Sequence, residues 1–117
     1  KKINWHVKGC ATSKTIKVSK RKIRVDSYDI NYFISKYNLT KIDLIQINIE
    51  CEEYPLLLNW IEIGFLKNVK YLQIQFHNFC ENYEENYKQI FEGLKKNGFE
   101  INYKYDFVWE SWVNKNI

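Results

Sequence analysis

The stretch "YLQIQF" (Tyr71 to Phe76) alternates apolar and polar side chains, which is the period of a β-strand with one covered face. Two further stretches follow the same pattern at a constant spacing of 27 residues, "LIQINI" (Leu44 to Ile49) and "GFEINY" (Gly98 to Tyr103). This recurrence predicts three strands of one sheet, joined by connections of similar length.

The segments before and between these strands carry apolar residues at helical spacing. The three predicted helices contain, in chain order, Ile30, Phe33, Ile34 and Tyr37; Leu57, Trp60 and Ile61; and Tyr83, Tyr87, Ile90, Phe91 and Leu94. Upstream, "TIKVSKRKIRV" (15–25) alternates apolar and basic residues around a turn at Ser19 to Arg21, which predicts a β-hairpin. Near the end of the chain, the spacing of Trp109 and Trp112 predicts a short helix folded onto the sheet.

Helical crossovers between neighbouring strands imply a parallel sheet with right-handed connections. We therefore predict a two-layer α/β fold in which an N-terminal β-hairpin is followed by three helix-strand repeats of about 27 residues that form a mainly parallel sheet. A chain of 117 residues suffices for one hydrophobic core, so residues 1–117 are predicted to form a single α/β domain.

The cysteines and the hydropathy indicate the expected environment. Cys10, Cys51 and Cys80 are odd in number and scattered, which is not typical of the disulfide framework of a small secreted domain. We therefore expect reduced thiols. No apolar run approaches the roughly 20 residues that span a bilayer, and the Lys1-Lys2 start is not followed by a signal-peptide core. These features favour a cytoplasmic protein without a membrane partner.

The charges divide the chain into two parts of opposite sign. Residues 1–24 contain nine Lys or Arg and no acid, whereas residues 25–117 contain nine Lys or Arg and fourteen Asp or Glu, a formal charge of −5. The acids gather directly after the predicted strands. Because the carboxyl ends of parallel strands meet at one edge of a sheet, this pattern predicts an acidic and aromatic rim at that edge.

Helix starts also favour acidic residues through the helix dipole, and this effect explains part of the enrichment at 50–53 and 81–85. The alternative interpretation is a partner-binding surface, in which carboxylates give specificity and aromatic side chains provide anchors. The predicted partner-binding residues, which we call the acidic rim, are Glu50, Glu52, Glu53, Tyr54, His77, Glu81, Tyr83, Glu84, Glu85, Asp106, Trp109 and Glu110.

No enzyme motif accompanies these residues. The candidate metal ligands His6, Cys10, Cys51, His77 and Cys80 form neither a CxxC nor an HxxxH pair. The four glycines are isolated from one another, so no phosphate-binding loop is predicted. We therefore predict no catalytic residue, no metal and no cofactor, and expect a protein that is not an enzyme.

Two strand regions resemble the core of leucine-rich repeats. "LTKIDLIQI" (39–47) and "LKNVKYLQI" (66–74) follow the L-x-x-L-x-x-L-x-L pattern of that family, over two of the three strands. The resemblance implies a stack of parallel repeats. A short parallel α/β sheet explains the same spacing with fewer repeats and is the preferred interpretation.

As a short, Lys-, Asn- and Ile-rich chain with clustered acids and aromatics, the protein also resembles in kind the small immunity proteins of bacterial toxin systems. That resemblance implies an antitoxin that neutralises a protein toxin, such as a nuclease, by covering its active or substrate-binding site. A regulatory antagonist of the anti-sigma type is a variant of the same interpretation.

The alternative function class is nucleic-acid binding. The basic hairpin, with Lys20, Arg21, Lys22 and Arg24, is of the type that follows a phosphate backbone. Edge lysines that prevent strand aggregation explain the same charges without any ligand. A basic protein partner is therefore the first expectation and nucleic acid the second.

Overall fold

The computed structural model describes residues 2–8, 11–13 and 22–117. It divides into two compact units, Lys1–Thr40 and Lys41–Ile117, each of which is described by itself. The expectation of a single domain over residues 1–117 stays a prediction. Within the described residues, no helix has the length and apolar character needed to cross a membrane.

The first unit contains a small antiparallel sheet and one helix. Its strands β1 (Lys2–Lys8), β2 (Ala11–Ser13) and β3 (Lys22–Asp26) have the order β2-β1-β3. Residues 15–21 of the predicted hairpin lie outside the described residues. Its last segment belongs to β3, which pairs with β1. The predicted first helix is α1 (Ile30–Tyr37), which begins after Asp29 because that side chain accepts a hydrogen bond from the backbone N–H of Tyr32 at 2.9 Å.

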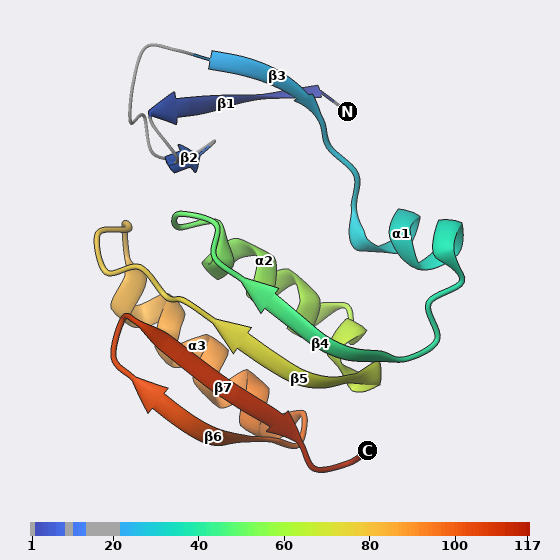
Figure 1. Cartoon of the computed structure of the whole chain (residues 1–117). Coiled ribbons are helices and arrows are strands. Elements are labelled where there is room, and N and C mark those ends of the chain that lie inside the picture. Colours follow the sequence, from blue (N-terminus) through green and yellow to red (C-terminus); the bar gives the residue numbers. More distant parts are fainter. Residues whose placement is uncertain (1, 9–10, 14–21) are drawn as a thin grey trace. The chain divides into compact units, whose positions relative to one another are not determined.

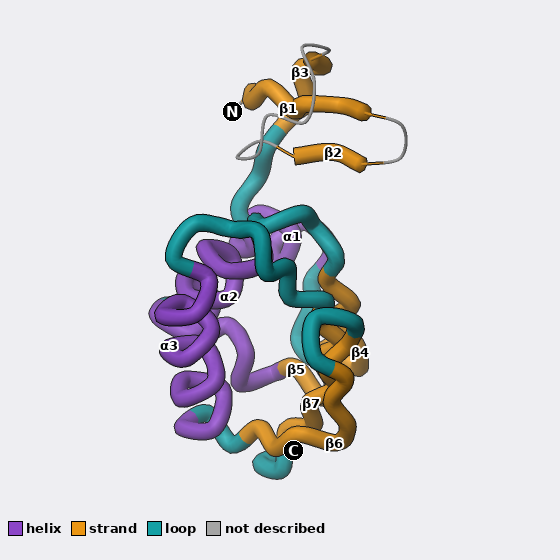
Figure 2. The backbone as a smooth tube through the Cα atoms, turned by 90° about the vertical axis from the view of Figure 1, so that its left-hand side faces the viewer, coloured by secondary structure: helices purple, strands orange, loops and turns teal. Residues whose placement is uncertain are grey.

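The second unit is a two-layer α/β structure. Its four-stranded sheet has the order β4-β5-β7-β6 (Figure 1), and the helices α2 and α3 cover one face of it (Figure 2). The elements are β4 (Ile42–Ile47), α2 (Glu53–Glu62), the 3-10 helix η1 (Phe65–Asn68), β5 (Val69–Ile74), α3 (Tyr83–Lys96), β6 (Phe99–Tyr105) and β7 (Trp109–Asn114). Leu57, Leu72, Ile90 and Leu94 are fully buried between the two layers.

The sheet is mixed, which corrects the prediction of three equivalent repeats in a mainly parallel sheet. Strands β4 and β5 are parallel, but β7 lies between β5 and β6 and is antiparallel to both. The predicted helix at Trp109 and Trp112 is therefore wrong. A turn in which Phe107 has a φ of 54° and Val108 N–H donates to the Tyr105 carbonyl sends the chain back as a strand. The resemblance to leucine-rich repeats fails for the same reason, because an antiparallel strand interrupts the stack.

Strand β6 still runs in the same direction as β5, because both are antiparallel to β7. The register confirms one common row across the sheet, in which Ile47 pairs with Ile74, Ile74 with Glu110, and Glu110 with Lys104. The ends of β4, β5 and β6 and the start of β7 therefore lie along one edge, which we call the carboxyl edge. This edge positions the candidate site.

Candidate functional site

The loop that leaves β4 at the carboxyl edge has an unusual backbone. Glu50 and Cys51 have φ angles of 51° and 80°, a left-handed conformation that residues with a side chain adopt at a cost. Cys51 forms a disulfide with Cys80, and their Cα atoms lie 5.6 Å apart. The expectation of reduced thiols is therefore wrong for this pair, because the pairing of β4 with β5 brings together two cysteines that are 29 residues apart in the chain.

His77, which follows β5, contacts Glu50 in the loop after β4 and Glu53 at the start of α2, and we call these three residues the His77 cluster. Oε1 of Glu53 lies 2.9 Å from Nδ1 of His77 and also accepts the backbone N–H of His77 at 2.9 Å. Nε2 of His77 lies 3.8 Å from Oε1 of Glu50. In a neutral imidazole, a carboxylate opposite Nδ1 favours the tautomer that carries its proton there.

Glu53 is fully buried at the first residue of α2, where the helix dipole favours a negative charge. Among the residues that the structure describes, its second oxygen, Oε2, is buried without a hydrogen-bond partner. Buried polar atoms nearly always have a partner, and the explanations for an exception include a catalytic role and an ordered water or ion. This oxygen makes the His77 cluster a candidate site.

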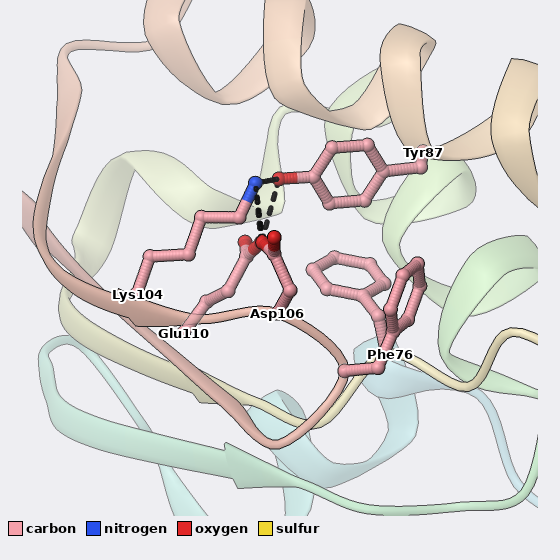
Figure 3. A pocket seen from close by; sticks show the side chains of 6 residues that line it. Phe76, Tyr87, Lys104, Asp106 and Glu110 are labelled. Carbon is pink, nitrogen blue, oxygen red and sulfur yellow. Dashed lines mark hydrogen bonds and ion pairs between the residues drawn. The ribbon is translucent and has the colours of Figure 1, made fainter.

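A second group of polar side chains, which we call the Lys104 cluster, joins α3 to β6 and β7 (Figure 3). The Tyr87 hydroxyl donates to Oε1 of Glu110 at 2.6 Å and accepts a hydrogen bond from Nζ of Lys104 at 2.8 Å. Nζ of Lys104 also lies 3.3 Å from Asp106 and 3.5 Å from Glu110. The other oxygen of Glu110 accepts the indole N–H of Trp112 at 3.1 Å.

These contacts set the protonation states of the Lys104 cluster. Burial, followed by the hydrogen bond to Glu110, raises the pKa of Tyr87 to about 12. The hydrogen bond with Tyr87 is the largest cause that raises the pKa of Lys104 above its ordinary value. Near neutral pH the cluster therefore holds a neutral phenol beside a lysine that stays protonated.

The residues of the Lys104 cluster line a cavity of about 220 Å³. Its lining is Phe76, Tyr87, Lys104, Asp106, Phe107 and Glu110, so aromatic rings and charged groups share one space (Figure 3). Tyr54 connects this cavity to the His77 cluster. Its hydroxyl donates to the His77 carbonyl at 2.7 Å, and its ring centroid lies 5.4 Å from that of Phe76. Burial, the charge of Glu53 and, among smaller causes, that of Glu110 raise the pKa of Tyr54.

The structure brings several residues of the acidic rim together. Glu50, Glu53 and His77 form one cluster, Asp106 and Glu110 belong to the other, and Tyr54 lies between them. Glu52 is buried, Trp109 is half-buried, and Tyr83 donates to Glu84 at the start of α3, where Glu81 and Glu85 are also exposed. No observation tests a role of these residues in partner binding, so that assignment stays a prediction.

Sequence reasoning missed Lys104 and Tyr87 as site residues. Tyr87 stands at an apolar helix position, and Lys104 stands in a strand whose neighbours are exposed. The only sequence signal was the placement of Lys104 two residues before Asp106, beside the acids of the third strand end. Of the metal candidates, Cys10 lies outside the described residues, and Cys51 and Cys80 are joined in a disulfide. Within the described residues, no group of three or more His, Cys, Asp or Glu side chains is arranged to hold a metal ion.

The fold is that of an α/β protein, a class in which ligand-binding and catalytic groups usually gather at the carboxyl edge of the sheet. The His77 and Lys104 clusters lie at this edge. Residues 5–101 match the family model described as Methyltransferase FkbM domain, and the chain therefore belongs to this family. Neither a curated protein nor a solved structure matches the chain.

The family membership corrects the functional predictions. The interpretation as an immunity protein, antitoxin or other non-enzymatic binder is wrong, because the family is one of methyltransferases, which are enzymes. The alternative of nucleic-acid binding through the basic hairpin is overturned by the same match. The structure explains two of the acidic residues at this edge by their internal hydrogen bonds. Glu53 is buried and contacts the ring of His77. Glu110 is almost fully buried and accepts hydrogen bonds from Tyr87 and Trp112.

Proposed function

We propose that this protein takes part in methyl transfer to a hydroxyl group, with the carboxyl edge of its second unit forming the acceptor side of the site. The family match supports methyl transfer. The observation that carries the choice of acceptor is the hydrogen bond between His77 and the buried Glu53. A hydroxyl is a weak nucleophile that becomes reactive when a base takes its proton.

His77 is the base in this proposal. Glu53 holds the ring by accepting the Nδ1 proton and stabilises the positive charge that develops when Nε2 accepts a second proton. The backbone N–H of His77 donates to the same carboxylate oxygen, so the main chain and the ring are oriented together. The acceptor hydroxyl gives its proton to Nε2, which leaves the oxygen able to act as a nucleophile.

The methyl donor that such a family implies is S-adenosylmethionine, which supplies an activated methyl group when bound. The described residues do not fit this donor. The cavity of about 220 Å³ is smaller than the roughly 300 to 1,000 Å³ of sites for drug-sized ligands. The proposal therefore concerns the acceptor side and the residues that hold it.

A transfer assay tests the proposal. The purified protein is incubated with tritium-labelled S-adenosylmethionine and a small-molecule extract of its native cell, and labelled products are separated by chromatography. We expect a labelled methyl ether, and a His77→Gln variant that forms it at least about a hundredfold more slowly because the base is lost. Asn78→Ala, at the exposed neighbouring residue, is the matched control and should retain the wild-type rate.

Labelling on nitrogen or carbon alone, or a His77→Gln variant as active as the control, would overturn the assignment of a hydroxyl acceptor. A complete absence of labelled product would overturn the activity itself.

A further inference from the structure

The cavity of the Lys104 cluster has a distinctive charge arrangement. One cation, Lys104, and two carboxylates, Asp106 and Glu110, line the same small space, and Lys104 contacts both carboxylates. A cationic ligand would meet Lys104, and an anionic ligand would meet two carboxylates. The lining therefore favours a neutral ligand whose polar groups both donate and accept hydrogen bonds, which is the property of hydroxyl groups.

The exposed fractions show which of these groups face a ligand. The side chain of Glu110 is only 4 % exposed, and its two oxygens accept hydrogen bonds from the Tyr87 hydroxyl and the Trp112 indole N–H. The side chains of Lys104 and Asp106 are 34 % and 76 % exposed. Glu110 thus holds the cluster together, while Lys104 offers N–H donors and Asp106 offers oxygen acceptors at the opening. Because these two groups lie 3.3 Å apart, adjacent hydroxyls of one ligand reach both.

The remaining walls are aromatic. Phe76 and Phe107 line the cavity beside Tyr87, and the rings of Phe76 and Tyr87 meet edge to face with centroids 5.0 Å apart. Figure 3 shows the polar ends of Lys104, Asp106 and Glu110 converging on the Tyr87 hydroxyl, with Phe76 alongside. A pyranose ring has C–H faces that pack on such side chains and hydroxyls around its edge. The cavity of about 220 Å³ is smaller than the sites of drug-sized ligands, which favours a ligand of one ring over a larger one.

We propose that this cavity binds one sugar ring, with adjacent hydroxyls hydrogen-bonded to Lys104 and Asp106 and the ring packed against Phe76 and Phe107. This inference rests on the proposed function and makes it more specific, because it names a saccharide as the class of methyl acceptor. Tyr54 relates the two sites, since it contacts both the His77 carbonyl and Phe76.

The binding test needs no methyl donor. Methyl α-glucopyranoside, methyl α-mannopyranoside and methyl α-galactopyranoside are titrated separately into the purified protein, and binding is followed by tryptophan fluorescence, because Trp112 donates to Glu110 of the cluster. Methylammonium and acetate, titrated in the same way, represent a cationic and an anionic ligand. We expect saturable binding of at least one glycoside and weaker binding of both ions.

Two variants identify the site. Lys104→Met should lower glycoside affinity about tenfold or more, because a charge-assisted hydrogen bond is lost. Asp106→Asn, at an exposed side chain whose replacement leaves the core intact, should lower it several-fold and keeps the test valid if Lys104→Met does not fold. The matched controls are Lys67→Met and Asp43→Asn, at exposed residues of η1 and β4 away from the carboxyl edge.

The proposal is overturned if no glycoside binds saturably, if either ion binds more tightly, or if Asp106→Asn binds as the wild type does. The two proposals fail separately. Glycoside binding without any methyl transfer would contradict the proposed function alone, whereas methyl transfer to a hydroxyl of a non-saccharide product would contradict the sugar site alone. His77→Gln should slow transfer at least about a hundredfold and leave glycoside affinity unchanged.

Discussion

Nδ1 of His77 lies 2.9 Å from Oε1 of Glu53, and the side chain of Glu53 is fully buried. The two residues are 24 positions apart and meet because the parallel strands β4 and β5 end at the same edge. A buried carboxylate that orients an imidazole is the arrangement that makes histidine an effective base. This contact leads to the first prediction.

Glu53→Gln should lower kcat for methyl transfer by about 10- to 100-fold while KM changes little, because the amide no longer stabilises a protonated His77. Steady-state kinetics with the labelled product measure both constants. Glu62→Gln, at the exposed last residue of α2, is the matched control and should match the wild type. A Glu53→Gln variant that raises KM without lowering kcat would show that Glu53 acts only in binding.

Reduction of the Cys51–Cys80 disulfide should lower the free energy of unfolding by about 3 kcal/mol, because the unfolded chain regains the entropy of the loop between the two cysteines. Urea unfolding with and without a reductant measures the difference. In Cys80→Ala, which cannot form the bond, the reductant should have no effect. Equal free energies of unfolding with and without the reductant would argue against the disulfide. So would mass spectrometry of unreduced peptides that finds no peptide pair linked through Cys51 and Cys80.

Cys51→Gly should be more stable than Cys51→Ala by about 1 kcal/mol, although both variants lack the disulfide. The reason is the φ of 80° at this position, where a Cβ atom costs energy that glycine avoids. Thermal and urea unfolding under reducing conditions compare the two proteins directly. The same pair at Asn59, inside α2, should show the opposite order, because glycine disfavours a helix. An equal stability at Cys51 would contradict the left-handed backbone.

Alkaline pH should weaken the fold through Tyr87. The pKa of Tyr87 is about 12 in the folded protein and about 10 in an unfolded chain, so between these values the unfolded chain loses a proton that the folded protein keeps. The free energy of unfolding should therefore fall as pH rises from 10 to 12. Tyr87→Phe should show a shallower fall, measured by urea unfolding across this range. Tyr71→Phe, at an exposed tyrosine, should follow the wild type; identical slopes in all three proteins would refute the assignment.

The strands at β4, β5 and β6 and the three helices were predictable, because each depends on a short-range period of apolar residues. Even the gathering of acids at one edge followed, since β6 runs in the same direction as β5. The insertion of β7 was not predictable in this way. The spacing of Trp109 and Trp112 is compatible with one helix face, whereas in the strand the two residues belong to opposite faces and only Trp112 is fully buried.

Local patterns in the chain were enough to establish an α/β protein with helices on one face of a sheet and polar residues at its carboxyl edge. The strand order, the Cys51–Cys80 bond, the contact of His77 with Glu53 and the meeting of Lys104 with Tyr87 emerged from the folded structure. Each of these joins residues 17 to 29 positions apart or depends on which strands pair. Such contacts are set by the packing of whole elements, and no period in the sequence encodes them.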